Sequence, residues 1–375
     1  IDSSVPGWHS TGWYARPGAR IEFTVPSEAV ARGFLLRIGC HADTLWHTQE
    51  WKRVPEITRE FAVDAATIIA VNPFGGPIYV VAPEGCTLGR IRVRERGAIL
   101  APRFVLGETT LEDWRASARA RPAPWAEIES KKLVISVPSS AVRGLEDPEA
   151  LMKFWDRVLD AQAKLASIPL ERARPERFVC DRQISAGYMH SGYPIMMHLD
   201  VQRTVVSLEQ LVDGEHMWGF VHELGHNLQQ GDWTFEGTGE VTNNLFAAYA
   251  IEVCCELAEG KHGHGAVDVP PSFEAYVERG ASFDEWKREP FLALEMYMQV
   301  QREFGWDVLR KTFAEYRRLN MAERPKDDAA KRDQWLVRLS RVCGRDLGAF
   351  FESWGVPTSE AARKSLSDLT AWGGK

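Results

Sequence analysis

The chain has little cysteine, no excess of basic charge and no long apolar run. Six cysteines are spread over 375 residues without a CxxC pair, which excludes a disulfide-dense scaffold and a cysteine-based zinc finger. The net charge is -7, so the basic footprint of a nucleic-acid-binding protein is missing. The most apolar stretch, residues 65–83, is interrupted by Asn72, Pro73, Gly75 and Gly76 and cannot span a bilayer. We therefore expect neither nucleic-acid binding nor a membrane span.

The cysteines and the first residues bear on the compartment of the protein. The six thiols are either free and buried, which we favour, or one pair forms a disulfide between Cys40 and Cys86. The chain begins IDSSVPGWHS, with neither a methionine nor a basic and apolar leader. Either a signal peptide has been removed or the chain is an excised piece of a longer one. The first possibility predicts an exported protein.

Strand patterns give way to helix patterns along the chain. Residues 1–110 contain short alternating segments bounded by turn residues, such as ARIEFTV, GFLLRIG and IYVVAP, which predict a β-sandwich-like domain. Asp147 then precedes a helix with an apolar face of Leu151, Phe154, Trp155, Val158 and Leu159. The order of strands before helices predicts an α+β fold with an α-rich catalytic region over 111–260 and a helical C-terminal part over 261–375.

One short motif carries metal chemistry. His222, Glu223 and His226 form the pattern HExxH, within a segment whose apolar residues recur at helical spacing. Four residues make just over one helical turn, so the two imidazoles lie on one face and can bind the same ion. Neutral imidazoles suit Zn2+, and Glu223 would lie beside a water molecule as a general base. The alternative is a pair of histidines packed in a helix interface.

Catalytic zinc needs a third protein ligand. Glu240 opens the helical segment EVTNNLFAAYAIEVCCELAE and is our candidate. Glu236 is the rival, but it lies in a glycine-flanked loop, and rigid elements hold ligands better. Asn244, one turn beyond Glu240, would either orient a ligand histidine or lie on the helix surface. Four other histidines lack a carboxylate in helical register and are expected not to be ligands: His41, His47, His262 and His264.

Several segments together resemble the peptidase M60 (enhancin-like, mucin-targeting) family of gluzincin-type zinc peptidases. They are SAGYMHSGYPIM (185–196), HELGHN (222–227), GTGEVTNNLF (237–246), NPFGGPIYV (72–80), FFESWGVP (350–357) and the long segment 38–61. The resemblance covers nearly the whole chain. It implies a gluzincin catalytic core and a bacterial, secreted or cell-surface or periplasmic endopeptidase that acts on mucins and other O-glycosylated proteins. It also implies His222, His226 and Glu240 as zinc ligands and Glu223 as the base.

Two further sets of residues are candidates for contacts with the substrate. Tyr188 and His190 would donate a hydrogen bond to the tetrahedral intermediate, unless they are a packed tyrosine and a structural histidine. Trp233, with Asp232, lies between the HExxH helix and Glu240 and would contact a glycan, since aromatic faces stack on sugar rings. Most of the 14 tryptophans are expected in the core. Trp46 and Trp51 among them are expected to pack between domains.

Other functions remain open at this point. The chain is expected to be a monomer. The protein could also be a zinc endopeptidase that ignores glycans, or a carbohydrate-binding or scaffold protein with structural zinc. Structural zinc is usually closed by four protein ligands, and only three are evident, which favours catalysis. Vertebrate members of the resembled family act as channel-associated factors. They usually lack the sequence GTGEVTNNLF of segment 237–246, so a non-enzymatic role of that kind is less expected.

Overall fold

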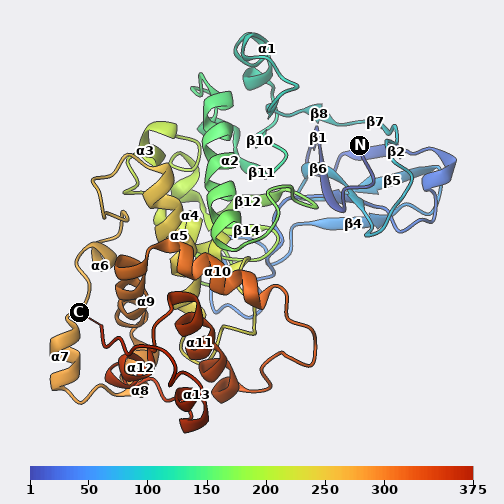
Figure 1. Cartoon of the computed structure of the whole chain (residues 1–375). Helices are drawn as coiled ribbons and strands as arrows, with labels where there is room; N and C mark the ends of the chain where they lie inside the picture. Colours follow the sequence, from blue (N-terminus) through green and yellow to red (C-terminus); the bar gives the residue numbers. More distant parts are fainter. Residues whose placement is uncertain (375) are drawn as a thin grey trace. The chain divides into compact units, whose positions relative to one another are not determined.

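The computed structural model describes residues 1–374 and separates them into two compact units (Figure 1). The first unit comprises Ile1–Asp156 and Glu171–Leu208, and the second comprises Arg157–Leu170 and the residues from Glu209 onward. These limits differ from the expected boundaries near residues 110 and 260, and that three-part division stays a prediction.

The first unit begins with two antiparallel sheets that share a core. Strands whose residues alternate between buried and exposed put Ile21, Phe23, Leu36, Ile38 and Val80 into this core. One sheet has the order β4 (Arg59–Ala62), β3 (Leu35–Ile38), β6 (Gly76–Ala82), β1 (Gly7–Ala15), β8 (Ile99–Leu100), and the other β5 (Thr67–Val71), β2 (Arg20–Thr24), β7 (Arg94–Arg96). The expected sandwich-like N-terminal region is confirmed.

A six-stranded mixed sheet completes the first unit. Its order is β13 (Met189–His190), β14 (Ile195–His198), β12 (Glu176–Asp181), β11 (Leu133–Pro138), β10 (Trp125–Glu129), β9 (Arg103–Val105). The pairs β10–β11 and β13–β14 are antiparallel, and the other neighbours are parallel. Buried Arg177 of β12 donates to Glu127 of β10 over 2.7 Å, and Glu127 also accepts from Tyr79 of β6. This buried charge pair joins the mixed sheet to the five-stranded sheet within the unit.

Helix α2 (Pro148–Leu165) has the predicted start and the predicted buried face. The Asp147 carboxylate accepts a hydrogen bond from the Ala150 backbone N–H over 2.8 Å, as expected of a residue that caps a helix. The five apolar residues expected on one face of this helix are all buried. The helix starts in the first unit and ends in the second. A short helix, α1 (Leu111–Ala116), precedes it.

The second unit is helical. Its largest cluster of buried apolar side chains includes Trp286, Trp335, Trp354 and Phe313. The helices are α3 (Leu208–Val212), α4 (Trp218–His226), α5 (Gly239–Cys254), α6 (Gly265–Asp268), α7 (Phe273–Glu278), α8 (Phe283–Arg288), α9 (Pro290–Phe304), α10 (Trp306–Tyr316), α11 (Asp328–Cys343), α12 (Gly348–Ser353) and α13 (Glu360–Lys364). The sheets lie in the first unit and most of the helices in the second, so the expected α+β class is confirmed.

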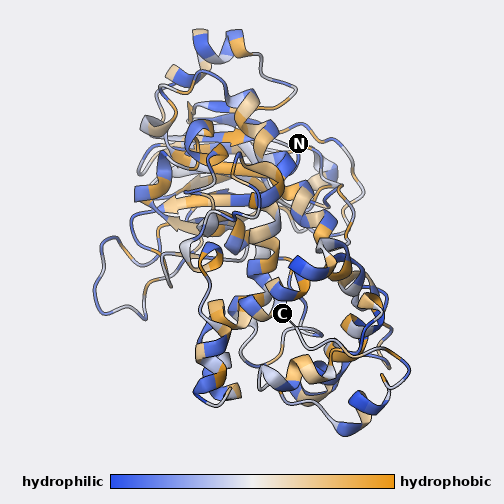
Figure 2. Ribbon diagram, turned by 60° about the vertical axis from the view of Figure 1, so that its left-hand side comes forward, coloured by the Kyte–Doolittle hydropathy of each residue, from blue (hydrophilic) through white to orange (hydrophobic). Residues whose placement is uncertain are grey.

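Hydropathy agrees with this arrangement. The central strands in Figure 2 are mostly orange, whereas the helices carry both hydrophobic and hydrophilic residues. Within residues 1–374, no helix combines the length and the apolar character that crossing a membrane requires. All six cysteines are free thiols, so the alternative of a Cys40–Cys86 disulfide is wrong for this structure.

Candidate metal centre

The HExxH segment forms helix α4, as its periodicity predicts. Phe220, Val221 and Leu224 are buried, while His222 and His226 stay partly exposed on another face. The two imidazole rings lie edge to face with their centres 4.8 Å apart. One turn of helix therefore presents two ring nitrogens on the same side.

Helix α5 packs closely against α4 because Gly225 has no side chain. A Cβ atom at this position would lie 2.5 Å from the backbone oxygen of Asn243 on α5, which is shorter than any real contact. Glu240, near the start of α5, departs from helical geometry with φ -95° and ψ 17°. The close packing and this irregular first turn bring the Glu240 carboxylate to the two histidines of α4.

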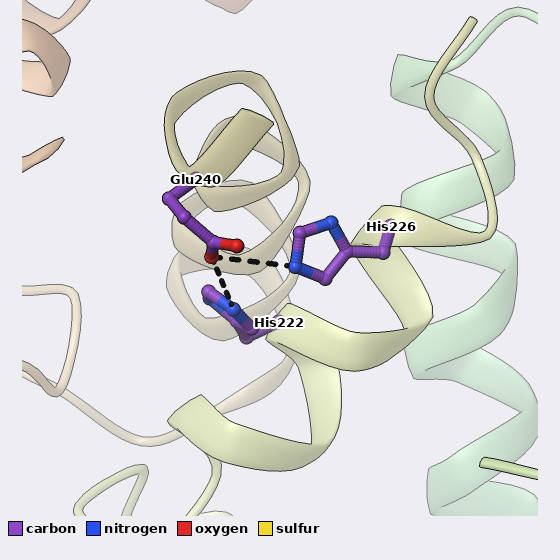
Figure 3. A group of neighbouring side chains, drawn as sticks. All are labelled: His222, His226 and Glu240. Carbon is purple, nitrogen blue, oxygen red and sulfur yellow. Dashed lines mark ion pairs between the residues drawn. The ribbon is translucent and has the colours of Figure 1, made fainter. Parts of the chain in front are cut away.

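The three expected ligands converge (Figure 3). Glu240 Oε2 lies 3.1 Å from His222 Nε2 and 3.4 Å from His226 Nε2. Ligand atoms at the corners of a tetrahedron around zinc, about 2.0–2.1 Å from the ion, lie about 3.3–3.4 Å from one another. Both distances from Glu240 are close to this value, all three ligand atoms lie within 4.8 Å of one another, and the donor set of two imidazoles and one carboxylate suits zinc. Among residues 1–374, only this group of three His, Cys, Asp or Glu residues has that spacing.

The other ring nitrogen of each histidine also has a partner. His222 Nδ1 lies 2.7 Å from Asn244 Oδ1, and His226 Nδ1 lies 2.8 Å from Gln229 Oε1. An Nδ1–H that donates to these oxygens leaves Nε2 unprotonated toward the ion, which fixes the tautomer a ligand needs. Asn244 in turn donates to the backbone oxygen of Glu240 over 2.7 Å. One amide thus links two of the three candidate ligands.

Asn243 of α5 also lies beside the candidate ligands, and within residues 1–374 only one of its two amide atoms has hydrogen-bond partners. Its amide nitrogen lies 3.1 Å from His222 Nε2 and 3.0 Å from His226 Nε2, beside both candidate ligand atoms. Its Oδ1 is buried and has no hydrogen-bond partner among the described residues. A buried polar atom without a partner is costly, and a bound water molecule or ion would satisfy it. Core tryptophan nitrogens share this property here, so the oxygen alone does not mark a binding site.

The candidate ligands also perturb one another's pKa values. Hydrogen bonds with His222 and His226 hold the pKa of Glu240 well below its usual value, so its carboxylate stays ionised. Burial lowers the pKa of His226, but hydrogen bonds with Glu240 and Gln229 outweigh this and raise it. The Glu240 side chain is 57% exposed, so the cluster is open to solvent on this side.

Glu223 lies next to the ligands without joining them. Its Oε1 is 4.0 Å from His222 Nε2, and its side chain is 10% exposed. Glu223 is not one of the three residues whose ligand atoms converge. It is close enough to receive a proton from a molecule bound between them.

Tyr188 and His190 belong to the first unit, whereas the candidate ligands belong to the second. The Tyr188 ring is 55% exposed, and burial together with a hydrogen bond to Asp200 raises its pKa to about 12. Its hydroxyl therefore remains protonated. His190 Nε2 lies 2.9 Å from an Asp43 carboxylate oxygen, and Nδ1 lies 3.0 Å from the Ser191 backbone oxygen. Their role as hydrogen-bond donors to the substrate stays a prediction.

The expected sugar contact of Trp233 does not fit its position. The side chain is 0% exposed and packs against Phe313 and Tyr316, with ring centres 4.9 and 5.5 Å away. A ring without an exposed face cannot stack on a ligand, so Trp233 belongs to the core. Asp232 is partly exposed and lies 3.7 Å from the Arg324 guanidinium. A substrate contact by Asp232 stays a prediction.

The sequence reasoning missed three residues of the cluster, namely Gly225, Gln229 and Asn243. Gln229 follows His226 by three residues but lies beyond the end of α4, so helical spacing did not mark it. Gly225 is a glycine inside a helix, which usually has a packing reason. Asn243 carries no signal of its own, because its position depends on how closely α5 approaches α4.

Comparisons with known proteins agree with this arrangement. The profile of the family described as peptidase M60, enhancin and enhancin-like, matches residues 97–355. The N-terminal domain of M60-like peptidases matches residues 1–94. The boundary between the two matches lies near residue 95.

Several curated relatives are vertebrate proteins. TRPM8 channel-associated factor 2 of Bos taurus is 38% identical, over 98% of this chain and 40% of its own length. The TRPM8 channel-associated factor homolog of Xenopus laevis is 36% identical, over 99% of this chain and 41% of its own length. The chain thus spans about two fifths of the length of these relatives.

Solved structures share the fold at lower identity. A conserved protein of unknown function from Bacillus anthracis superposes with a TM-score of 0.79 at 23% identity, covering 98% of this chain and 74% of its own. The M60 catalytic domain of Clostridium perfringens ZmpC, in complex with sialyl T antigen, gives 0.71 at 17%, covering 98% and 75%. IMPa from Pseudomonas aeruginosa, in complex with an O-glycopeptide, gives 0.70 at 19%, covering 98% and 51%. At such identities the likeness concerns the fold.

Proposed function

We propose, from the premise that the chain belongs to the enhancin and enhancin-like M60 peptidase family, that it is the catalytic region of a zinc endopeptidase that cuts O-glycosylated proteins. One observation supports the hydrolytic part most directly. Three candidate ligand atoms lie within 4.8 Å of one another, with Glu240 3.1 and 3.4 Å from the two imidazoles, and the buried Glu223 carboxylate lies beside them outside this group.

His222, His226 and Glu240 would hold the zinc. When bound, the ion supplies Lewis-acid chemistry, which polarises a peptide carbonyl and makes water more acidic. Glu223 would take a proton from the attacking water and then deliver it to the leaving amine. Asn244 and Gln229 keep the imidazoles in one tautomer and orientation through this cycle. The open side at Glu240 gives the substrate access.

The glycan part of the proposal draws on the family relatives whose structures contain O-glycans or an O-glycopeptide. Because Trp233 is buried, we look for the sugar contact among the partly exposed aromatic side chains near the histidines. Trp218 lies on α4 one turn before His222, on the same helix face, and is partly exposed, although its ring also contacts His264 and Phe291. We assign the sugar contact beside the cleaved bond to Trp218.

The hydrolytic proposal is tested with Glu223→Gln. This variant should bind one equivalent of zinc like the wild type and should lose cleavage of a mucin-type glycoprotein, as followed by mass spectrometry of the products. His226→Ala is the matched variant that should lose both zinc and cleavage. Full cleavage by Glu223→Gln, or cleavage by the wild type that withstands a chelator, would contradict the proposal.

The glycan requirement is tested separately. The wild type is given an O-glycopeptide and the same peptide after deglycosylation, and Trp218→Ala is compared with it on both. We expect cleavage of the glycosylated peptide alone and a loss in Trp218→Ala. Equal cleavage of both peptides would leave a zinc endopeptidase that ignores glycans.

The curated relatives favour a second candidate function. Proteins named for association with the TRPM8 channel are 34–38% identical over nearly the whole chain, so a non-catalytic, protein-binding role is the competing proposal. It predicts that the zinc-loaded wild type cleaves no glycoprotein.

The first proposal, hydrolysis of O-glycosylated proteins, includes a location outside the cell, where mucins occur.

A further inference from the structure

An exposed pair of tryptophans lies on a long loop of the first unit. Trp46 is 61% exposed and Trp51 is 54% exposed, although six other tryptophans of the chain are fully buried. The two indole rings contact each other edge to face, with centres 5.4 Å apart. The expectation that they pack between domains is therefore wrong for this structure, and both keep ring surface free for a ligand.

The loop is held in place by its own contacts. The Trp51 indole N–H donates to the Leu45 backbone oxygen over 3.0 Å, and the Thr48 N–H donates to the same oxygen. A ring fixed by its only polar atom presents its apolar faces in one orientation. Such a pre-organised ring loses little conformational freedom when a ligand binds.

A second segment of the first unit pins the same loop. The Arg53 guanidinium binds the buried Asp181 carboxylate, with Nη2 and Oδ2 2.8 Å apart. The Gln183 amide oxygen accepts from the Lys52 N–H over 2.6 Å, and its nitrogen donates to the Glu50 backbone oxygen over 2.8 Å. These contacts lie on both sides of Trp51 and fix the loop without covering the two rings.

The residues around Trp46 and Trp51 indicate which kind of ligand the two rings can bind. The sequence neighbours of the two rings are mostly polar, including Thr44, His47 and Glu50, and Val54 is the one other exposed large apolar residue of segment 41–60. The apolar core of a protein–protein interface is larger and poor in charge. Segment 41–60 carries four acidic and three basic side chains, so it offers no basic cluster to an anionic membrane.

A small polar cavity lies beside the base of the loop. It has a volume of about 310 Å³ and is lined by Asp43, Thr44, Glu56, Thr58 and Arg59 among others. It offers hydrogen-bond donors and acceptors of both charges, which suits hydroxyl groups better than an ion of one sign. A sugar ring needs both aromatic faces and hydroxyl-binding groups, and Thr44 of the cavity lining lies two residues before Trp46 in the chain.

We propose that Trp46 and Trp51 form a carbohydrate-binding platform, on which a pyranose ring stacks through its apolar C–H face. The platform binds the glycan part of a glycoprotein, and its hydrogen-bond partners come from the polar residues of the same loop. It needs neither zinc nor Glu223, so it deepens the proposed substrate class without depending on hydrolysis.

The test measures binding of the full chain, carrying Glu223→Gln to prevent cleavage, to an immobilised mucin-type O-glycoprotein and to the same glycoprotein after enzymatic deglycosylation. Trp46→Ala and Trp51→Ala should each weaken binding to the glycosylated form about tenfold, the size of a lost stacking contact. Trp51→Phe should restore part of it. Leu100→Ala, which removes a half-exposed apolar side chain elsewhere in the first unit, is the matched control and should bind like the parent.

Three other outcomes would contradict the proposal that Trp46 and Trp51 bind a carbohydrate. Unchanged binding in the Trp46→Ala, Trp51→Ala double variant, with an unchanged melting temperature, removes the role of the rings. Equal, tryptophan-dependent binding to the deglycosylated protein would make the pair a protein-docking site. Tryptophan-dependent binding to vesicles of phosphatidylcholine and phosphatidylserine would make it a membrane contact. None of these results alters cleavage by the chain with Glu223 intact, so the proposed function is judged independently.

Discussion

Replacing Gly225 by alanine tests whether close helix packing builds the metal site. In an exposed helix interior this change would stabilise the fold by about 0.5–1 kcal/mol, because alanine is the better helix former. Here the new Cβ would lie 2.5 Å from the Asn243 backbone oxygen. Overpacking of this kind costs about 1–3 kcal/mol. We therefore expect a net loss of stability of about 1–2 kcal/mol.

The same change should weaken metal binding more than it weakens the fold. Relief of the clash moves α5 away from α4, and with it Glu240 and Asn244, which contact His222 from α5. Disturbing such partners typically costs about 10–100-fold in metal affinity. Zinc affinity is measured by competition with a chelator, and stability by denaturant unfolding of the chelated protein.

Gly239→Ala is the matched control. Gly239 is the first residue of α5, and a Cβ atom there would meet nothing within 4 Å. This variant should be neutral or slightly stabilised, with zinc affinity unchanged. If Gly225→Ala matched it in both measurements, the two helices would tolerate a wider separation, and the close packing would not be what assembles the ligands.

Three further variants test other parts of the structure. Asn244→Ala should weaken zinc binding about 10–100-fold, and Asn244→Asp should restore it, since a carboxylate oxygen also accepts from His222 Nδ1; equal affinity in all three proteins would contradict the role. Trp233→Ala should cost about 3–5 kcal/mol of stability by leaving a cavity, and its effect on cleavage should be the same for glycosylated and bare peptides. The hydrogen bond from His262 lowers the pKa of Glu252, so this carboxylate stabilises the fold above its unfolded pKa of about 4.3, and the contribution is lost as the pH falls through the lower folded value. Glu252→Gln should thus be destabilised near pH 7 and approach the wild type in acid, and a difference that does not depend on pH would refute this.

The parts of the site that could be predicted are those set by local geometry. The two histidines are four residues apart on one helix, so their convergence follows from the helical repeat alone. Glu240 could be chosen over Glu236 because it opens a helix, and Asn244 followed from the same register. The buried face of α2 was predictable for the same reason.

The parts that could not be predicted depend on contacts between distant segments. Trp233 lies beside the ligands in the sequence, yet Phe313 and Tyr316, some 80 residues further on, cover its ring. Trp46 and Trp51 belong to a residue type that is usually buried. Their exposure depends on how residues 181–183 hold their loop. Sequence proximity to a motif is therefore a poor guide to which aromatic residues a ligand can reach.

The arrangement of polar groups around α4 and α5 is an argument for chemistry over scaffolding. A structural zinc site gains stability from a fourth protein ligand and from burial, whereas the group here has three such residues among those described, and Glu240 is 57% exposed. The fold also buries the Glu223 carboxylate beside the candidate ligands, and among residues 1–374 the buried Asn243 oxygen has no hydrogen-bond partner. A structural site does not require a buried carboxylate beside its ligands, whereas hydrolysis at a metal ion requires a base in that position.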